Sequence, residues 1–136
     1  MKGHKAHNVM LIDDSETDLF VNRCMIQIHN STSTINSFNN PSKALQFLRG
    51  LDSNSGDFKK ELPEFIFLDI NMPLMDAFGF LSEFEELSEN IKDYTKIVLL
   101  TSSMNPRDLQ RAHSNKYVKD YIEKPISPDV LGRLFD

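Results

Sequence analysis

The chain has little of several features that would place it in other protein classes. It contains one cysteine, Cys24, in 136 residues, so it cannot form an intramolecular disulfide. It has no continuous apolar run near the ~20 residues that cross a membrane. Residues 1–7 lack the apolar core of a secretory signal. We therefore expect a cytoplasmic protein without a membrane-spanning segment.

Positive charge is also scarce. The chain has 15 lysine and arginine residues against 20 aspartate and glutamate residues, and its net charge is −5. Because proteins bind nucleic-acid backbones through basic patches, this balance argues against nucleic acid as a direct partner. A length of 136 residues is typical of one domain. We assign residues 1–7 to a flexible N-terminal tail and residues 8–136 to that domain.

The chain does have a regular alternation of strand-like and helix-like segments. Apolar runs and, at residues 32–38, an alternating pattern predict five strands, at residues 9–12, 32–38, 65–69, 96–100 and 118–123. Capping residues and apolar spacing predict five helices, which begin next to Ser15, Asn40, Asp76, Asn105 and Ser127. Strands that alternate with helices predict an α/β fold, a doubly wound five-stranded parallel sheet with helices on both faces.

Three local details follow from the same patterns. Glu16 and Asp18 lie in the first turn of the first helix, where the helix dipole favours acidic residues. The third helix is expected to carry Phe78, Leu81, Phe84 and Leu87 on one side. Residues 51–62 are polar and are expected to form a loop.

Polar residues gather where the expected strands end. Asp13 and Asp14 follow the first strand, Asp69 ends the third, Thr101 follows the fourth and Lys124 follows the fifth. In open parallel sheets these strand ends form one crevice. Three carboxylates held close together favour a hard dication, and oxygen ligands with room for water suit Mg²⁺. Asp69 could then act as the nucleophile toward a phosphoryl group, aided by Lys124 and Thr101.

This ordered set resembles the receiver domain of two-component response regulators, and the resemblance covers essentially the whole chain. The motifs that carry it are Asp13-Asp14, Asp69 with Met72-Pro73 and Met75-Asp76, Thr101-Ser102, and Tyr121 before Lys124-Pro125. The resemblance implies a flavodoxin-like strand order of 2-1-3-4-5. It also implies that Asp69 accepts a phosphoryl group from the phosphohistidine of a histidine kinase or a histidine phosphotransfer protein. Such a module catalyses its own phosphotransfer and autodephosphorylation and is not otherwise an enzyme.

The resemblance also implies a magnesium site. Asp14 and Asp69 would bind Mg²⁺ through side-chain oxygens and Asn71 through its backbone carbonyl. Asp13 would hold a metal-bound water. Lys124 would contact the phosphoryl group, and the Lys124–Pro125 peptide bond would be cis.

A switch is implied as well. Thr101 and Tyr121 would change position on phosphorylation and alter the face formed by the fourth helix, the fifth strand and the fifth helix. We expect that face to bind a downstream protein or to form a homodimer. As a working hypothesis, the contact residues are Leu131, Leu134, Phe135 and the region around Tyr121.

Two alternatives stay open beside this interpretation. The first is an interaction module that works without phosphorylation, although every pocket residue is present. The second is a phosphatase of the haloacid dehalogenase type, which needs a second aspartate two residues after its nucleophile. Asn71 stands at that position and cannot act as a general acid. No output domain follows the last helix, so we expect a stand-alone receiver or one excised from a longer protein.

Overall fold

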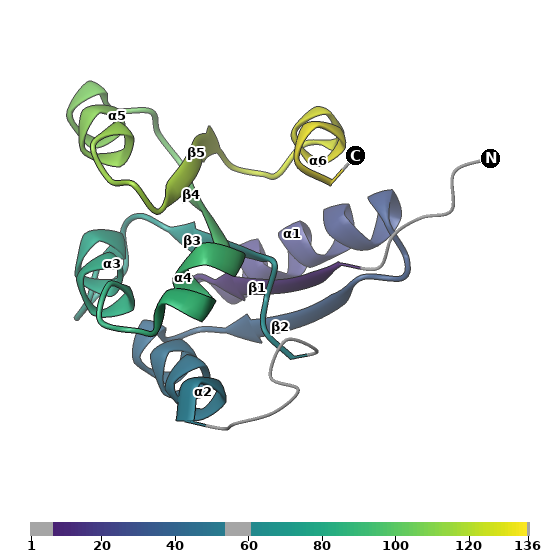
Figure 1. Ribbon diagram of the computed structural model, residues 1–136. Coiled ribbons are helices and arrows are strands. Elements are labelled where there is room, and N and C mark those ends of the chain that lie inside the picture. Colours follow the sequence, from purple (N-terminus) through teal and green to yellow (C-terminus); the bar gives the residue numbers. More distant parts are fainter. Residues whose placement is uncertain (1–6, 54–60, 136) are drawn as a thin grey trace.

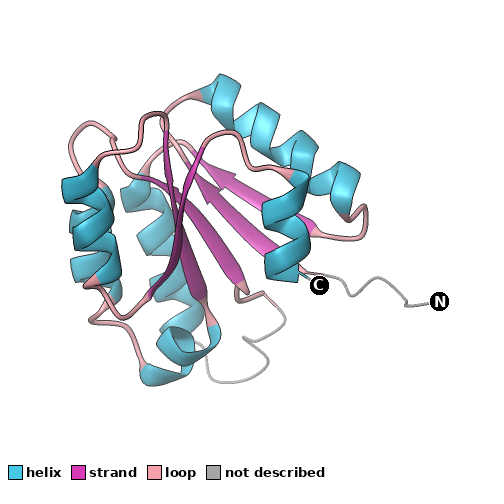
Figure 2. Ribbon diagram, turned by 90° about the horizontal axis from the view of Figure 1, so that it is seen from above, coloured by secondary structure: helices cyan, strands magenta, loops and turns pink. Residues whose placement is uncertain are grey.

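The computed structural model describes residues 7–53 and 61–135 and contains a single sheet between two layers of helices (Figures 1 and 2). The strands are β1 (Asn8–Ile12), β2 (Thr34–Phe38), β3 (Phe65–Asp69), β4 (Lys96–Thr101) and β5 (Val118–Glu123). The helices are α1 (Glu16–His29), α2 (Pro41–Ser53), α3 (Ala77–Phe84), α4 (Glu89–Tyr94), α5 (Pro106–His113) and α6 (Pro128–Phe135). Within the described ranges, no helix is long and apolar enough to cross a membrane.

The sheet confirms the predicted class and strand order. All four pairings are parallel, and the order is β2-β1-β3-β4-β5. From β1 the chain passes to β2 on one side, and it then returns to place β3 on the other side. The carboxyl ends of β1 and β3 therefore flank the point where the strand order reverses, which is where open α/β sheets bind ligands.

The packing of the core explains why the sequences of the central strands are continuous apolar runs. In β3, Ile66 and Leu68 face the cluster under α2, α3 and α5, whereas Phe65 and Phe67 face the cluster under α1 and α6. Because successive side chains of a strand point to opposite faces, a strand covered on both sides needs apolar residues at every position. The sheet is thus buried on both faces, and polar groups concentrate at its strand ends.

The predicted helix starts are confirmed by capping hydrogen bonds. In each of the first four predicted helices, the capping side chain accepts from a backbone N–H two or three residues later; the caps are Ser15, Asn40, Asp76 and Asn105. Such caps satisfy amide groups that have no partner inside the helix. The entry of α1 is therefore well defined, and α1 follows directly on the acidic residues after β1.

The expectation of five helices is wrong, because the described residues form six. We expected one helix to extend to Leu87, but α3 ends at Phe84. The Leu87 N–H bonds to the Phe84 carbonyl 3.0 Å away, three residues earlier, and this tight turn closes the helix. The extra helix α4 then begins after Ser88 and buries Ile91 in the core. A short helix with one apolar contact has too little periodicity to be recognised in sequence.

Two expected boundaries also change. The loop expected at residues 51–62 is wrong at its start, because α2 continues to Ser53 and buries Leu51; residues 54–60 lie outside the described residues. His7 is not part of a flexible tail. It is buried, with its Nδ1 atom 2.6 Å from Oε1 of Glu64 and its ring stacked on Phe135 at a centroid distance of 4.2 Å. The rest of the expected tail, residues 1–6, lies outside the described residues.

Candidate functional site

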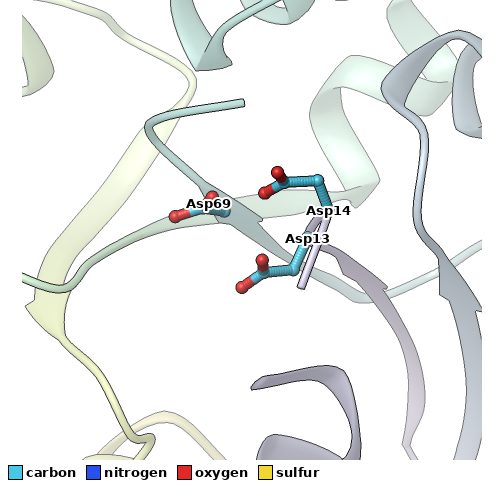
Figure 3. A group of neighbouring side chains, drawn as sticks. All are labelled: Asp13, Asp14 and Asp69. Atoms are coloured by element: carbon cyan, nitrogen blue, oxygen red, sulfur yellow. The ribbon is translucent and has the colours of Figure 1, made fainter. Parts of the chain in front are cut away.

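Three aspartates meet at the ends of β1 and β3 (Figure 3). Asp13 and Asp14 directly follow β1, and Asp69 is the last residue of β3. One carboxylate oxygen from each lies within 4.8 Å of the others. Asp13 and Asp69 are only 2% and 4% exposed, whereas Asp14 faces solvent. The cluster therefore combines two buried carboxylates with one that is open to solvent, and we refer to these aspartates and their surroundings as the pocket.

Lys124 brings positive charge into this pocket from the end of β5. Its Nζ atom lies 3.0 Å from Oδ2 of Asp13 and 3.3 Å from Oδ1 of Asp69. The Lys124 backbone N–H donates to the Thr101 carbonyl at 2.8 Å, which ties the end of β5 to the end of β4. The Lys124–Pro125 peptide bond is cis, the isomer that the family resemblance implies.

A fourth carboxylate, which sequence reasoning missed, also binds this lysine. Oδ2 of Asp18, in the first turn of α1, lies 2.7 Å from Nζ of Lys124. From the sequence alone, Asp18 is expected only to interact favourably with the helix dipole. The two residues are 106 positions apart, and no local pattern connects them. The contact exists because α1 leaves the same sheet edge at which β5 ends.

Burial shifts the pKa values of the acids in the pocket. Burial, reinforced by the negative charge of Asp13, raises the pKa of Asp69 to about 6, although Lys124 opposes the shift. Burial also raises the pKa of Asp13, in spite of hydrogen bonds from the Ser15 backbone and Lys124. For Lys124, burial alone would lower the pKa, but the bonds to Asp18 and Asp13 outweigh it and raise the pKa. The pocket thus holds more negative charge than its one lysine neutralises.

Three other predicted site residues are Thr101, Tyr121 and Asn71. Unlike Lys124, they form no side-chain hydrogen bond to the three aspartates within the described part of the chain. Thr101 ends β4 and is 1% exposed, and its hydroxyl donates to the Ser103 carbonyl at 2.8 Å. Tyr121 is buried in the core cluster on the α5 side of the sheet, and its hydroxyl has no hydrogen-bond partner among the described residues. Asn71 is exposed in the loop after β3.

Comparison with known proteins decides the family. The model of the response regulator receiver domain matches residues 9–135. The chain belongs to this receiver domain family. A two-component response regulator from Cytophaga hutchinsonii has the same fold, with a TM-score of 0.85 and 27% identity over 96% of both chains. A response regulator receiver protein from Dyadobacter fermentans also supports the fold, with a TM-score of 0.77 and 22% identity. The match covers 96% of this chain and 98% of that protein chain.

The chain also matches curated relatives of different length. The probable methanogenesis regulatory protein FilR2 of Methanothrix harundinacea is 30% identical over 92% of this chain and 76% of that protein. The autoinducer 1 sensor kinase/phosphatase LuxN of Vibrio campbellii is 27% identical over 94% of this chain. The match spans only 13% of LuxN, so the activity of that whole protein is not transferred to this receiver.

The donor set of this receiver fits Mg²⁺. The ion takes oxygen ligands at ~2.0–2.1 Å in an octahedron, so two ligands on opposite sides are ~4 Å apart. The carboxylate oxygens already lie within 4.8 Å of one another, and small side-chain rotations would bring them to that spacing. Burial is the main cause of the raised pKa values of Asp13 and Asp69, and a dication bound beside these poorly solvated carboxylates would stabilise their charged forms.

The hypothesis of an apolar contact face in the last helix of the receiver is wrong for its main residues. Leu131, Phe135 and Tyr121 are buried, and Leu134 is half-buried against the same core cluster as Leu131. The apolar residues of α6 pack that helix on the sheet, and Tyr121 packs in the core cluster on the α5 side. A partner on this side would have to contact other, exposed residues of α5, β5 and α6.

Proposed function

We propose that this receiver is a phosphorylation-dependent switch whose phosphoacceptor is Asp69. The observation that carries the proposal is the position of its carboxylate. It lies at the end of β3, beside two further aspartates, and 3.3 Å from the Lys124 ammonium group. A strand-end carboxylate with an adjacent cation and a set of metal ligands is suited to phosphoryl transfer. The phosphodonor would be a phosphohistidine of a histidine kinase or a histidine phosphotransfer protein.

In this reaction one oxygen of Asp69 forms a bond to phosphorus. The bond from phosphorus to the imidazole nitrogen of the donor breaks, and its electron pair returns to that nitrogen. Asp69 has to be ionised to attack the phosphorus atom. Neutral pH lies above the Asp69 pKa of about 6, so most of the carboxyl groups are ionised. Mg²⁺, held by Asp14, Asp69, the Asn71 carbonyl and a water on Asp13, would neutralise charge on the transferring group.

Lys124 and Thr101 would stabilise the phosphorylated state. Phosphorylation adds about −1.5 to −2 charges, and the Lys124 ammonium group lies 3.3 Å from Oδ1 of Asp69. The Thr101 hydroxyl would leave the Ser103 carbonyl, 2.8 Å away, and donate to a phosphoryl oxygen. A charge-assisted hydrogen bond contributes ~1.5–3 kcal/mol. Since 1.4 kcal/mol is a tenfold change in an equilibrium, this exchange is enough to shift the population of the switch.

Tyr121 would transmit the change to the face formed by α5, β5 and α6. Its buried hydroxyl has no hydrogen-bond partner among the described residues, and an unsatisfied buried hydroxyl costs ~1–3 kcal/mol. Movement of the segment after Thr101 could supply an acceptor and relieve that cost. Tyr121 belongs to the core cluster against which half-buried Leu109 of α5 packs, so the switch would reach the surface through α5.

The phosphodonor has a suitable docking surface on α1. Phe20 and Ile28 of this helix are 67% and 81% exposed, and Val21, next to Phe20, lines the same hollow as Lys124. Exposed apolar side chains that gather along one helix can form an interaction site. We expect the combined Phe20→Ala and Ile28→Ala changes to slow transfer from a phosphohistidine protein. Phosphorylation by acetyl phosphate, which needs no docking, should be unchanged.

The decisive experiment compares the wild type with Asp69→Asn in Mg²⁺ and acetyl phosphate. We expect one acid-stable, base-labile phosphoryl adduct in the wild type and none in the variant, measured by intact mass. Amide NMR should show shifts at Thr101 and Tyr121 on phosphorylation. Asp93→Asn, an exposed aspartate on α4, is the matched control and should behave as the wild type.

Three other outcomes would contradict the proposal. An adduct that persists in Asp69→Asn would place the phosphoacceptor elsewhere. Mg²⁺ binding without any adduct would favour an interaction module that works without phosphorylation. Continuous turnover of small phosphate esters would favour a phosphatase, in spite of Asn71 at the general-acid position.

A further inference from the structure

Asp18 forms the shortest of the three ion pairs of Lys124. Its oxygen lies 2.7 Å from the Nζ atom, against 3.0 Å for Asp13 and 3.3 Å for Asp69. The Asp18 side chain is 40% exposed, whereas those of Asp13 and Asp69 are nearly inaccessible. The Lys124 ammonium group therefore forms ion pairs with two buried carboxylates of the reaction pocket and with one partly exposed carboxylate at its rim.

We propose that Asp18 is a positioning residue that competes with the phosphoryl group for Lys124 and so restrains phosphorylation of Asp69. This inference rests on the proposed function, because it concerns the lysine that would stabilise the phosphoryl group. Asp18 in the first turn of α1 would then affect the phosphorylation reaction, in addition to its favourable interaction with the helix dipole.

The donor count of Lys124 supports competition. An ammonium group has three N–H donors and no acceptor, and three carboxylates surround it. Once Asp69 carries a phosphoryl group, the added oxygens need a donor from the same ammonium group. The Nζ atom already donates to Asp13 and Asp18, so only one donor is left for the phosphoryl oxygens unless one of these partners gives up its hydrogen bond or the lysine moves.

Asp18 is the partner that can be released at least cost. Asp13 is buried, so loss of Lys124 would leave part of its charge without compensation. Asp18 can regain water, because a hollow of ≈ 260 Å³ adjoins the ion pair between α1 and the end of β5. That hollow is lined by Asp18, Val21, Asn22, Ser102, Lys124 and Pro125. Until it is released, Asp18 occupies one donor of the ammonium group, and its negative charge opposes an incoming phosphoryl anion.

The test uses three variants with different expected results. Asp18→Asn keeps the shape but removes the charge, and Asp18→Glu keeps the charge. Glu16→Gln removes the same charge from the same helical turn, but Glu16 accepts from the Asn39 side chain at 2.9 Å and not from Lys124. Each variant is compared with the wild type by affinity for beryllofluoride at saturating Mg²⁺ and by the rate of phosphorylation with acetyl phosphate. Urea denaturation checks that each variant is folded.

We expect Asp18→Asn to bind beryllofluoride about two- to fivefold more tightly, the size of a partly exposed ion pair. Its phosphorylation rate should rise by a similar factor, whereas Asp18→Glu and Glu16→Gln should stay near the wild type. Unchanged or weaker binding by Asp18→Asn would overturn the inference. So would an equal gain in Glu16→Gln, which would indicate a general effect of net charge. If the wild type itself bound no beryllofluoride and gained no phosphoryl group, the proposed function would fail with it.

Discussion

Replacement of Asp69 by asparagine is expected to stabilise the fold at neutral pH, because the pocket holds this carboxylate at a cost. Its pKa rises from an ordinary value of 3.8 to about 6, chiefly through burial. Since one pKa unit corresponds to 1.36 kcal/mol, ionised Asp69 lowers the free energy of unfolding by ~3 kcal/mol. Asparagine has the same shape without the charge. The variant should therefore recover up to ~3 kcal/mol when no metal is present.

The sign of the pH dependence follows from the raised pKa. Between the unfolded value of 3.8 and the folded value of about 6, the folded state binds more protons at Asp69 than the unfolded state. The contribution of Asp69 to stability therefore falls as pH rises through this window, and the full cost is present above about pH 6. The difference between Asp69→Asn and the wild type should be largest at pH 7.5 and should shrink to ~1 kcal/mol near pH 4.5.

Urea denaturation in EDTA at pH 7.5 and pH 4.5 measures this difference directly. Asp93→Asn is the control, because it removes an exposed aspartate outside the pocket. We expect it to change stability by less than ~0.5 kcal/mol. The reasoning would be refuted if Asp69→Asn were no more stable than the wild type at pH 7.5. A stabilisation of equal size at both pH values would also refute it, since ionisation would then not be the cause.

Three further predictions concern packing and metal binding. Asn22→Ala removes the acceptor of the buried Ile126 N–H, 3.0 Å away, so urea denaturation should show a loss of ~1–3 kcal/mol. Phe135→Ala removes the ring that stacks on His7 at 4.2 Å; we expect thermal denaturation to show a loss of ~3 kcal/mol, and a loss below ~1 kcal/mol would contradict the packing. Mg²⁺ at 100 times its Kd should stabilise the wild type by ~2.7 kcal/mol, and Asp14→Asn should lose most of this gain.

Local patterns in the sequence were sufficient for the main elements and for the members of the pocket. Apolar runs identified the strands, and Ser15 and Asp76 marked helix starts, because these signals depend on neighbouring residues alone. The rule that parallel strands present their carboxyl ends at one edge then predicts, from sequence alone, that Asp69 and Lys124 lie close together. The strand order came with the family resemblance, since alternation of strands and helices does not determine it.

Tertiary structure decided which of these residues touch and which are buried. The Asp18–Lys124 ion pair joins residues 106 positions apart, and it depends on the direction in which α1 leaves the sheet. His7 was expected in a tail, but its partners Glu64 and Phe135 come from distant segments. An apolar residue near the end of a chain can equally be exposed or buried, and only the packing of α6 on β1, β3 and α1 decides it for Phe135. Sequence alone therefore determined the chemistry available at the strand ends, whereas side-chain packing between distant elements decided its geometry and its counter-ions.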